Sequence, residues 1–130
     1  VKHFGVSNFS PSQFELLQSR LDTPLVTNQV QFSAMYLDPI FDGTFDLMQQ
    51  RRVAPMIWSP VAGGRMFRDE DEGSRRVRDA LAQVGEELGG APLDQVALAW
   101  TMRHPVGVVP VLGTGKALRP RLSKICKTPK

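Results

Sequence analysis

Near its start the chain reads Lys2-His3-Phe4-Gly5-Val6-Ser7-Asn8-Phe9-Ser10-Pro11, and this stretch sets the pattern for the whole sequence. We predict a strand from Lys2 to Ser7 that stops in the loop after it. Ser10 is a strong helix N-cap, because Pro11 suits the first helical position and Gln13 completes a capping box. The stretch therefore predicts a strand, a tight loop and a helix that runs toward Arg20.

The order of strand and then helix recurs along the rest of the chain. Further strands are predicted at 25–32, 54–59 and 108–112, and further helices at 44–51, 75–88, 92–103 and 116–124. Asp38-Pro39 and Asp42-Gly43 mark a loop, and 69–73 reads as an acidic, solvated spacer. Strands that alternate with helices indicate an α/β fold with a parallel sheet and right-handed crossovers.

Four β/α units are compatible with two architectures. They can form a small open sheet, or they can form half of a (β/α)₈ barrel of the TIM type, which takes about 250 residues. Val1 leads straight into a strand, and Pro120 interrupts the final helix, so both ends look cut. We therefore expect residues 1–130 to form a single, partial domain.

The composition favours a globular domain, because hydrophobic residues make up 42% and charged residues 22% of the 130 residues. The basic excess of +3 gathers after the last predicted strand, where it forms either a phosphate-binding surface or a solvated tail. This segment lacks interleaved aromatic residues, which argues against nucleic acid. A single cysteine, Cys126, and the lack of an apolar span or signal peptide lead us to expect a cytoplasmic protein without a membrane partner.

The best signal for chemistry is Gly113-Thr114-Gly115-Lys116, at the end of the last strand. Backbone N–H groups at such a place favour an anion, and Lys116 and Arg119 share one helix face. In a (β/α)₈ barrel, phosphate sites often come from the loops after the last two strands. Here those loops are 59–65 and 113–119. A plain helix cap is the alternative interpretation of the glycine motif.

Polar and aromatic side chains end the other strands. Ser7, Asn8 and Gln29 can hydrogen-bond a carboxamide or a sugar, although Ser and Asn also simply terminate strands. Trp58 can stack on a ligand ring or pack in a core. Trp100, on the apolar face of a helix, is predicted to be core.

The titratable residues form no recognisable catalytic group in the sequence. His3 and His104 have no neighbours at metal-ligand spacing, and His104 ends a helix, where a cation suits the dipole. Tyr36 is the sole tyrosine and a weak candidate for a catalytic acid. We therefore expect neither a metal nor a catalytic residue.

Five motifs together resemble the aldo/keto reductase family, and the glycine loops are similar to a bacterial, general-stress-type subgroup. The family patterns are R-x-I-G-V-S-N-F, x-N-Q-V-E, Y-S-P-L-A-x-G, Q-V-A-L-A-W and I-P-I-P-G-T-x-K. They correspond in the same order to residues 2–9, 27–31, 58–64, 95–100 and 109–116. The resemblance implies the last four β/α units of a (β/α)₈ barrel that binds NADP(H).

The resemblance also implies a role for each matched residue. Ser7, Asn8 and Gln29 would hold the nicotinamide carboxamide, and Trp58 would stack on the ring. The pyrophosphate would lie along Ser59, Val61 and Gly63. The glycine motif would hold the adenosine 2′-phosphate through Gly113, Thr114, Gly115, Lys116 and Arg119, which favours NADP(H) over NAD(H).

No residue matches the family's catalytic tetrad of Asp, Tyr, Lys and His, which lies on the first four strands. Leu122 and Ser123 stand where the family often has a Glu-Asn pair for the adenine. The resemblance therefore implies a cofactor-binding half that is inactive alone. The alternatives are a non-catalytic half barrel that self-associates into a homo-oligomer, or a proteolytic or cloning fragment of a full NADPH-dependent carbonyl reductase.

Overall fold

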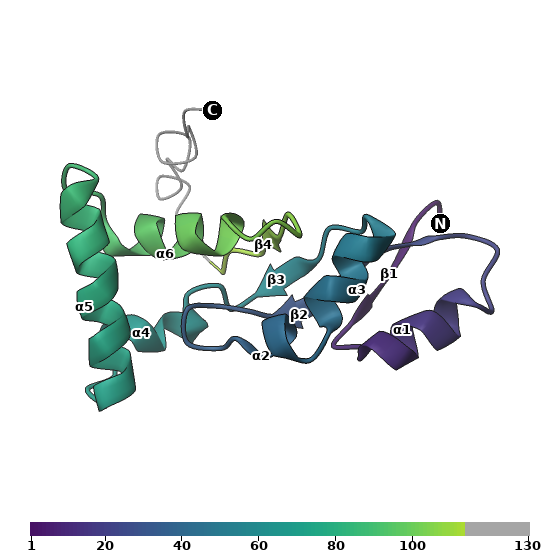
Figure 1. Ribbon diagram of the computed structural model, residues 1–130, viewed down its shortest axis with the longest axis horizontal. Helices are drawn as coiled ribbons and strands as arrows, with labels where there is room; N and C mark the ends of the chain where they lie inside the picture. Colours follow the sequence, from purple (N-terminus) through teal and green to yellow (C-terminus); the bar gives the residue numbers. More distant parts are fainter. Residues whose placement is uncertain (114–130) are drawn as a thin grey trace.

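The chain folds around one parallel sheet of four strands, as the computed structural model in Figure 1 shows for residues 1–113. The strands are β1 (Phe4–Ser7), β2 (Leu25–Gln31), β3 (Met56–Trp58) and β4 (Val109–Pro110). They lie in the order β1-β2-β3-β4, and each neighbouring pair is parallel. The predicted α/β class and parallel sheet are confirmed, although each strand is shorter than predicted. The predicted final helix lies outside the described residues.

Helices connect the strands. They are α1 (Pro11–Gln18), α2 (Asp38–Phe41), α3 (Thr44–Arg51), the 3₁₀ turn η1 (Ala62–Gly64), α4 (Arg65–Arg68), α5 (Glu72–Glu87) and α6 (Leu93–Met102). The capping box predicted at Ser10 is present, because the Ser10 Oγ accepts from the Gln13 backbone N–H and the Gln13 side chain accepts from the Ser10 N–H. This reciprocal pair starts α1 directly after the β1 loop.

Three segments differ from the prediction. The segments around Asp38-Pro39 and after Gly64, predicted as loop, contain the one-turn helices α2 and α4. The prediction of an acidic, solvated spacer at 69–73 is wrong as well, because Asp71 is the N-cap of α5 and accepts from the Ser74 N–H at 2.9 Å. Asp71 therefore satisfies a free backbone donor, and α5 begins three residues earlier than predicted.

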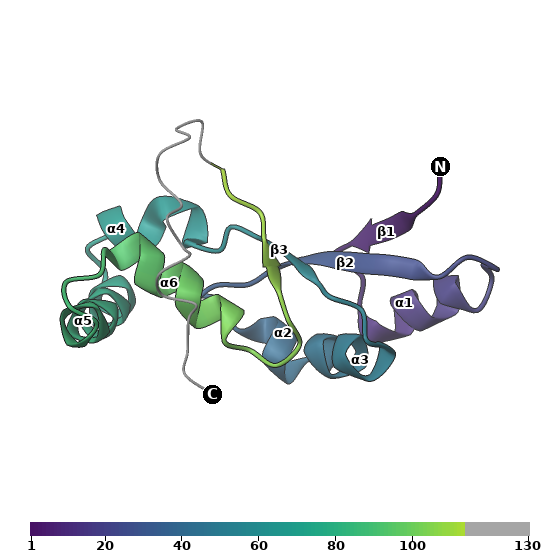
Figure 2. The ribbon, with the colours of Figure 1, turned by 90° about the horizontal axis from the view of Figure 1, so that it is seen from above.

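The helices α1, α2 and α3 lie together on one side of β1, β2 and β3 (Figure 2). The main core fills that side: Phe14 of α1 and Phe45 and Met48 of α3 are buried with Val30 and Ile57 of the sheet. A second cluster joins the other helices through Met66, Leu81, Val96 and Ala97. The side chains on the opposite face of the sheet are therefore not covered by these helices.

Thr27 ties β2 to β3 on that uncovered face. Its hydroxyl donates to the Ala54 carbonyl at 3.0 Å and accepts from the Met56 N–H at 3.1 Å. On the β1 side, a Cβ at Gly5 would lie 2.7 Å from the Thr27 methyl group and 3.2 Å from its carbonyl. The Thr27 side chain thus holds three strands together, and the glycine makes room for it.

The helices α5 and α6 each leave large apolar side chains exposed. Leu81 is buried, but Val84 and Leu88 are 43% and 54% exposed, because α5 turns Gly85 inward instead. A Cβ at Gly85 would lie 2.7 Å from the Ala91 carbonyl, so only glycine allows this close turn. Trp100 was predicted to be core, and this prediction is wrong in part, because the residue is 41% exposed although its ring stacks on that of Phe32.

None of the helices within residues 1–113 is both long enough and apolar enough to cross a bilayer.

Candidate functional site

Four predicted residues meet at the carboxyl ends of β1, β2 and β3. The Trp58 indole N–H donates to the Asn8 Oδ1 at 3.0 Å, across fifty positions of sequence. The Ser7 hydroxyl donates to the Gln29 carbonyl at 3.0 Å, and these two residues are register partners. The structure therefore brings Ser7, Asn8, Gln29 and Trp58 into one polar cluster.

Asn28, one residue before Gln29, holds the β1 loop in place. It is buried, its Nδ2 donates to the Phe9 carbonyl at 2.8 Å, and its Oδ1 accepts from the Phe9 N–H at 3.3 Å. The Asn8 N–H donates to the Gln29 carbonyl at 2.9 Å. Sequence reasoning missed this role, although a buried asparagine must find partners for its amide, and that requirement is the signal that could have found it.

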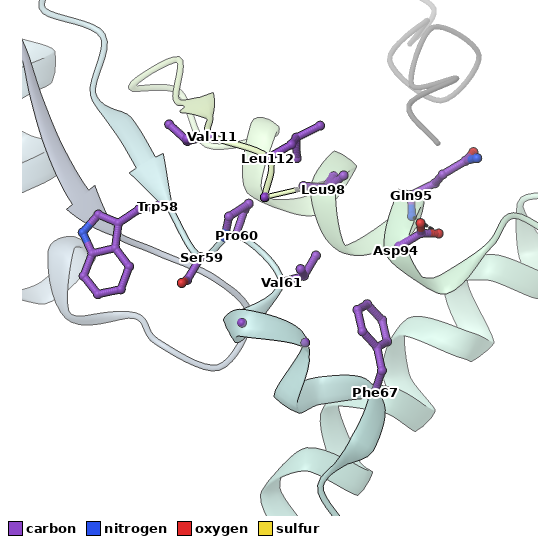
Figure 3. Close-up of a pocket in the computed structure, with 13 residues that line it drawn as sticks. Trp58, Ser59, Pro60, Val61, Phe67, Asp94, Gln95, Leu98, Val111 and Leu112 are labelled. Carbon is purple, nitrogen blue, oxygen red and sulfur yellow. Dashed lines mark hydrogen bonds between the residues drawn. The ribbon is translucent and has the colours of Figure 1, made fainter. Parts of the chain in front are cut away.

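A cavity of about 560 Å³ extends from Trp58 away from this cluster (Figure 3). One wall is the loop after β3, with Ser59, Val61 and Gly63, and the other is the segment after β4, with Val111, Leu112 and Gly113. Phe67 of α4 and Asp94, Gln95 and Leu98 of α6 complete the lining. The 59–65 loop and Gly113, the one described residue of the second loop predicted to bind phosphate, therefore line one cavity.

The β3 loop carries a run of left-handed backbone. Ser59 and Ala62 have φ of 51° and 53°, and Gly63 and Gly64 follow at 62° and 83°. For the two residues that are not glycine, this conformation costs on the order of 1–3 kcal/mol each, and such strain clusters at ligand sites. Among the described residues, nothing lies within 4 Å of a Cβ built on Gly63, so its backbone is open to a ligand.

Arg68 of α4 places a positive charge beside this loop. Its Nη2 donates to the Gly63 carbonyl at 3.2 Å, and its guanidinium lies 3.7 Å from where a Cβ of Gly64 would be. No pattern in the sequence predicts this contact, because α4 has only four residues and was not predicted. Gly113 is the last predicted site residue within the described part of the chain; Thr114, Gly115, Lys116 and Arg119 lie outside it.

A smaller cavity, of about 380 Å³, lies between the β1 and β2 loops and shares Trp58 and Asn8 with the polar cluster. Tyr36 lines it, and a hydrogen bond with Asp38, followed by burial and the charges of Asp38 and Asp42, raises the pKa of Tyr36. The phenol therefore holds its proton more tightly than usual and is a poor acid. Within residues 1–113, no three His, Cys, Asp or Glu side chains gather closely enough to bind a metal ion.

The fold and the site together define a class of protein. Successive parallel β/α units that carry a cavity at the carboxyl ends of the strands are typical of enzymes with the (β/α)₈ barrel. The sequence matches the aldo/keto reductase family over residues 1–121, and the chain belongs to that family.

Two bacterial oxidoreductases are similar to this chain in sequence. The chain is 48% identical over 119 residues to the uncharacterized oxidoreductase YcsN of Bacillus subtilis. The aligned region covers 92% of the chain and 40% of that protein. It is also 48% identical over 128 residues to the oxidoreductase YdhF of Escherichia coli. This aligned region covers 98% of the chain and 42% of that protein. The chain thus spans about two-fifths of the length of these relatives.

Solved structures agree on the fold. The thermostable aldo-keto reductase Tm1743, crystallised with the inhibitor epalrestat, superposes with a TM-score of 0.76 at 28% identity, over 98% of this chain and 44% of that one. An aldo/keto reductase from Klebsiella pneumoniae, crystallised with NADP and acetate, gives 0.69 at 22% identity, over 95% and 40%. The four β/α units therefore correspond to part of an aldo/keto reductase barrel.

Proposed function

We propose that this chain forms the NADP(H)-binding part of an aldo/keto reductase-type oxidoreductase. One observation carries the proposal: the polar cluster at Asn8 and the cavity between the loop after β3 and the segment 111–113 meet at Trp58, which lines the cavity and hydrogen-bonds to Asn8. A dinucleotide needs such an arrangement, because its ring and its phosphates are recognised by different chemistry on one continuous surface.

The ring end fits a carboxamide. The proton of the Ser7 hydroxyl is engaged with the Gln29 carbonyl, so the remaining lone pairs of Ser7 are available to accept a hydrogen bond. Asn8 supplies an amide group beside it, and we assign the Gln29 amide to the same carboxamide. A nicotinamide carboxamide offers one donor and one acceptor, and when bound its ring would exchange a hydride with a carbonyl substrate. In this proposal Trp58 stacks on the ring.

The phosphate end fits an anion. The backbone of Gly63 is open, Arg68 lies beside it, and Ser59 and Val61 line the same wall. We assign the pyrophosphate to this loop and to Gly113. Thr114, Gly115, Lys116 and Arg119 are proposed to hold the adenosine 2′-phosphate, which favours NADP(H) over NAD(H). The NADP in the similar Klebsiella pneumoniae structure supports this choice.

Catalysis needs a further group. Reduction of a carbonyl requires a proton donor beside the developing alkoxide. The resemblance to the family matches none of this chain's residues to the tetrad of Asp, Tyr, Lys and His. We therefore propose that the chain binds cofactor but does not turn over a carbonyl substrate alone.

Titration of the purified chain with NADPH, followed by quenching of tryptophan fluorescence, tests the proposal. We expect saturable binding that is tighter for NADPH than for NADH. Absence of binding at millimolar NADPH would contradict the proposal. Steady-state assays with NADPH and simple aldehydes should show no turnover. Turnover would contradict the proposal that the chain is inactive alone and would leave the proposal of cofactor binding intact.

Replacement of Gly113 by Ala tests the cavity wall directly. No atom of the described residues lies within 4 Å of a Cβ at Gly113, so the fold should tolerate the methyl group. The methyl group would instead occupy space that we assign to the pyrophosphate. We expect NADPH affinity to fall about tenfold or more, because overpacking costs about 1–3 kcal/mol.

The matched control is Gly73→Ala in α5, remote from the cavity, which should bind NADPH like the wild type. Equal affinity of Gly113→Ala and wild type in isothermal titration calorimetry would remove Gly113 from the site.

A further inference from the structure

The contact between Trp58 and Asn8 determines which way the Asn8 amide faces. An indole N–H can only donate a hydrogen bond, so the Asn8 atom 3.0 Å away must be the oxygen. An asparagine side chain can otherwise be turned by half a rotation with little change in shape. Here the partner's chemistry removes that ambiguity, and the Asn8 Nδ2 lies on the side away from the indole nitrogen.

The backbone of Asn8 is held in place by its neighbours. Its φ is 57°, its N–H donates to the Gln29 carbonyl, and Asn28 clamps the following residue, Phe9. The backbone that carries the amide is therefore fixed, and the hydrogen bond from the Trp58 N–H opposes rotation of the amide on it. Within the described part of the chain, the Asn8 Nδ2 donates to no acceptor, which leaves it available to a ligand.

The position of Trp58 is itself set by the sheet. Trp58 is the last residue of β3 and the register partner of Gln31 in β2, and its ring borders both cavities. The residue therefore has two separable properties toward a bound ring: a flat face, which any aromatic residue offers, and an N–H, which only tryptophan offers at this place.

We infer that the Trp58 N–H is a positioning group, which holds the Asn8 amide so that Nδ2 donates to the carboxamide oxygen of the nicotinamide ring. Together with Ser7, whose lone pairs accept, this gives the site one donor and one acceptor of fixed polarity. The inference rests on the proposed function, because it names what one residue does toward the ring of the proposed cofactor.

The test compares Trp58→Phe, which keeps an aromatic face and loses the N–H, with the wild-type chain. Isothermal titration calorimetry is run with NADPH and with 2′-phospho-ADP-ribose, which has the phosphates but no nicotinamide. We expect Trp58→Phe to weaken NADPH binding about 3- to 10-fold, the effect of one hydrogen bond. Affinity for 2′-phospho-ADP-ribose should stay within about twofold of wild type.

A second variant removes the Asn8 amide donor and leaves the Trp58 ring and its N–H unchanged. Asn8→Asp keeps an oxygen for the indole N–H and tolerates the positive φ, but it has no amide donor. Asn8→Asp should weaken NADPH and spare 2′-phospho-ADP-ribose. If Trp58 acts through the Asn8 amide, Trp58→Phe should cost much less in the Asn8→Asp background. Asn8→Asp alone carries the test if Trp58→Phe does not fold.

The outcomes distinguish this inference from the proposed function. If the wild-type chain binds neither ligand, both are overturned. The proposed function stands and the inference is overturned in three cases: unchanged NADPH affinity in either single variant, equal losses for both ligands, or an equal Trp58→Phe effect in the two backgrounds. An equal Trp58→Phe effect in the two backgrounds would mean that Trp58 contributes to NADPH binding without acting through the Asn8 amide.

Discussion

His104 illustrates how packing changes the chemistry of one residue. The sequence suggested a cation at the end of a helix, but the imidazole packs against Phe45, with ring centroids 4.9 Å apart, and its Nδ1 accepts from the Val106 N–H at 3.3 Å. Burial lowers the pKa of His104 below its ordinary value of about 6.5, and the charge of Asp46 opposes the shift less strongly. The neutral imidazole is therefore the folded form.

This pKa predicts a loss of stability in mild acid. A lowered pKa means that the unfolded chain takes up the proton more readily than the folded chain. The stabilisation is fully present above about pH 6.5 and is lost as the pH falls through the lower folded-state pKa. We expect the urea midpoint to fall between pH 7 and pH 5, and the fall to be smaller in His104→Gln. Equal falls in both proteins would exclude His104 as the cause.

Single residues were predictable where a motif marks them and not where a distant contact defines them. Ser7, Asn8, Gln29 and Trp58 end strands and so were expected to converge. Arg68 acts through a carbonyl contact with Gly63 that exists only once α4 has formed, and no local pattern announces it.

At the scale of the element, the capping box of α1 contributes directly to stability. The Ser10 hydroxyl satisfies one of the free N–H groups at the start of the helix. We predict that Ser10→Ala lowers the free energy of unfolding by about 1 kcal/mol. Ser19→Ala at the other end of α1 is the control and should cost less; equal costs in denaturant titrations would show that the cap adds nothing.

Element boundaries show the reach of sequence patterns. The helices α1, α3 and α6 follow apolar periodicity or caps and were located within a few residues. The helices α2 and α4 have four residues each, too few for a periodic pattern, and form because Pro39 and Gly64 shape the chain at their starts. Gly85 completes the buried face of α5 with Ser74 and Leu81, since its lack of a Cβ allows the close turn to Ala91.

At the scale of the whole molecule, the sheet is incompletely covered. The strands β1 and β4 are its edges, and the helices α1, α2 and α3 share one face. Phe4, Val26 and Val109 are 46%, 44% and 48% exposed along the strands. Periodicity alone left an open sheet and a half barrel equally possible, because both have the same alternating elements; the match to two-fifths of larger barrels favours the second.

Open edges and exposed apolar strand residues predict self-association. Unpaired backbone groups and apolar surface both favour contact with a second copy of the chain. We expect sedimentation velocity to show dimers or larger species at micromolar concentration, in proportions that rise with concentration. A single monomeric species across that range would refute the expectation.

The Thr27 bridge has a consequence for amide hydrogen exchange. The Met56 N–H lies within the sheet and donates to the side-chain oxygen of Thr27. The Thr27 hydroxyl therefore contributes to the protection of this amide from deuterium. In Thr27→Val, of nearly the same shape, the Met56 amide should exchange faster, while the Val109 amide, which donates to the Pro55 carbonyl, keeps its rate. The exchange rate of this backbone amide therefore depends on a side chain.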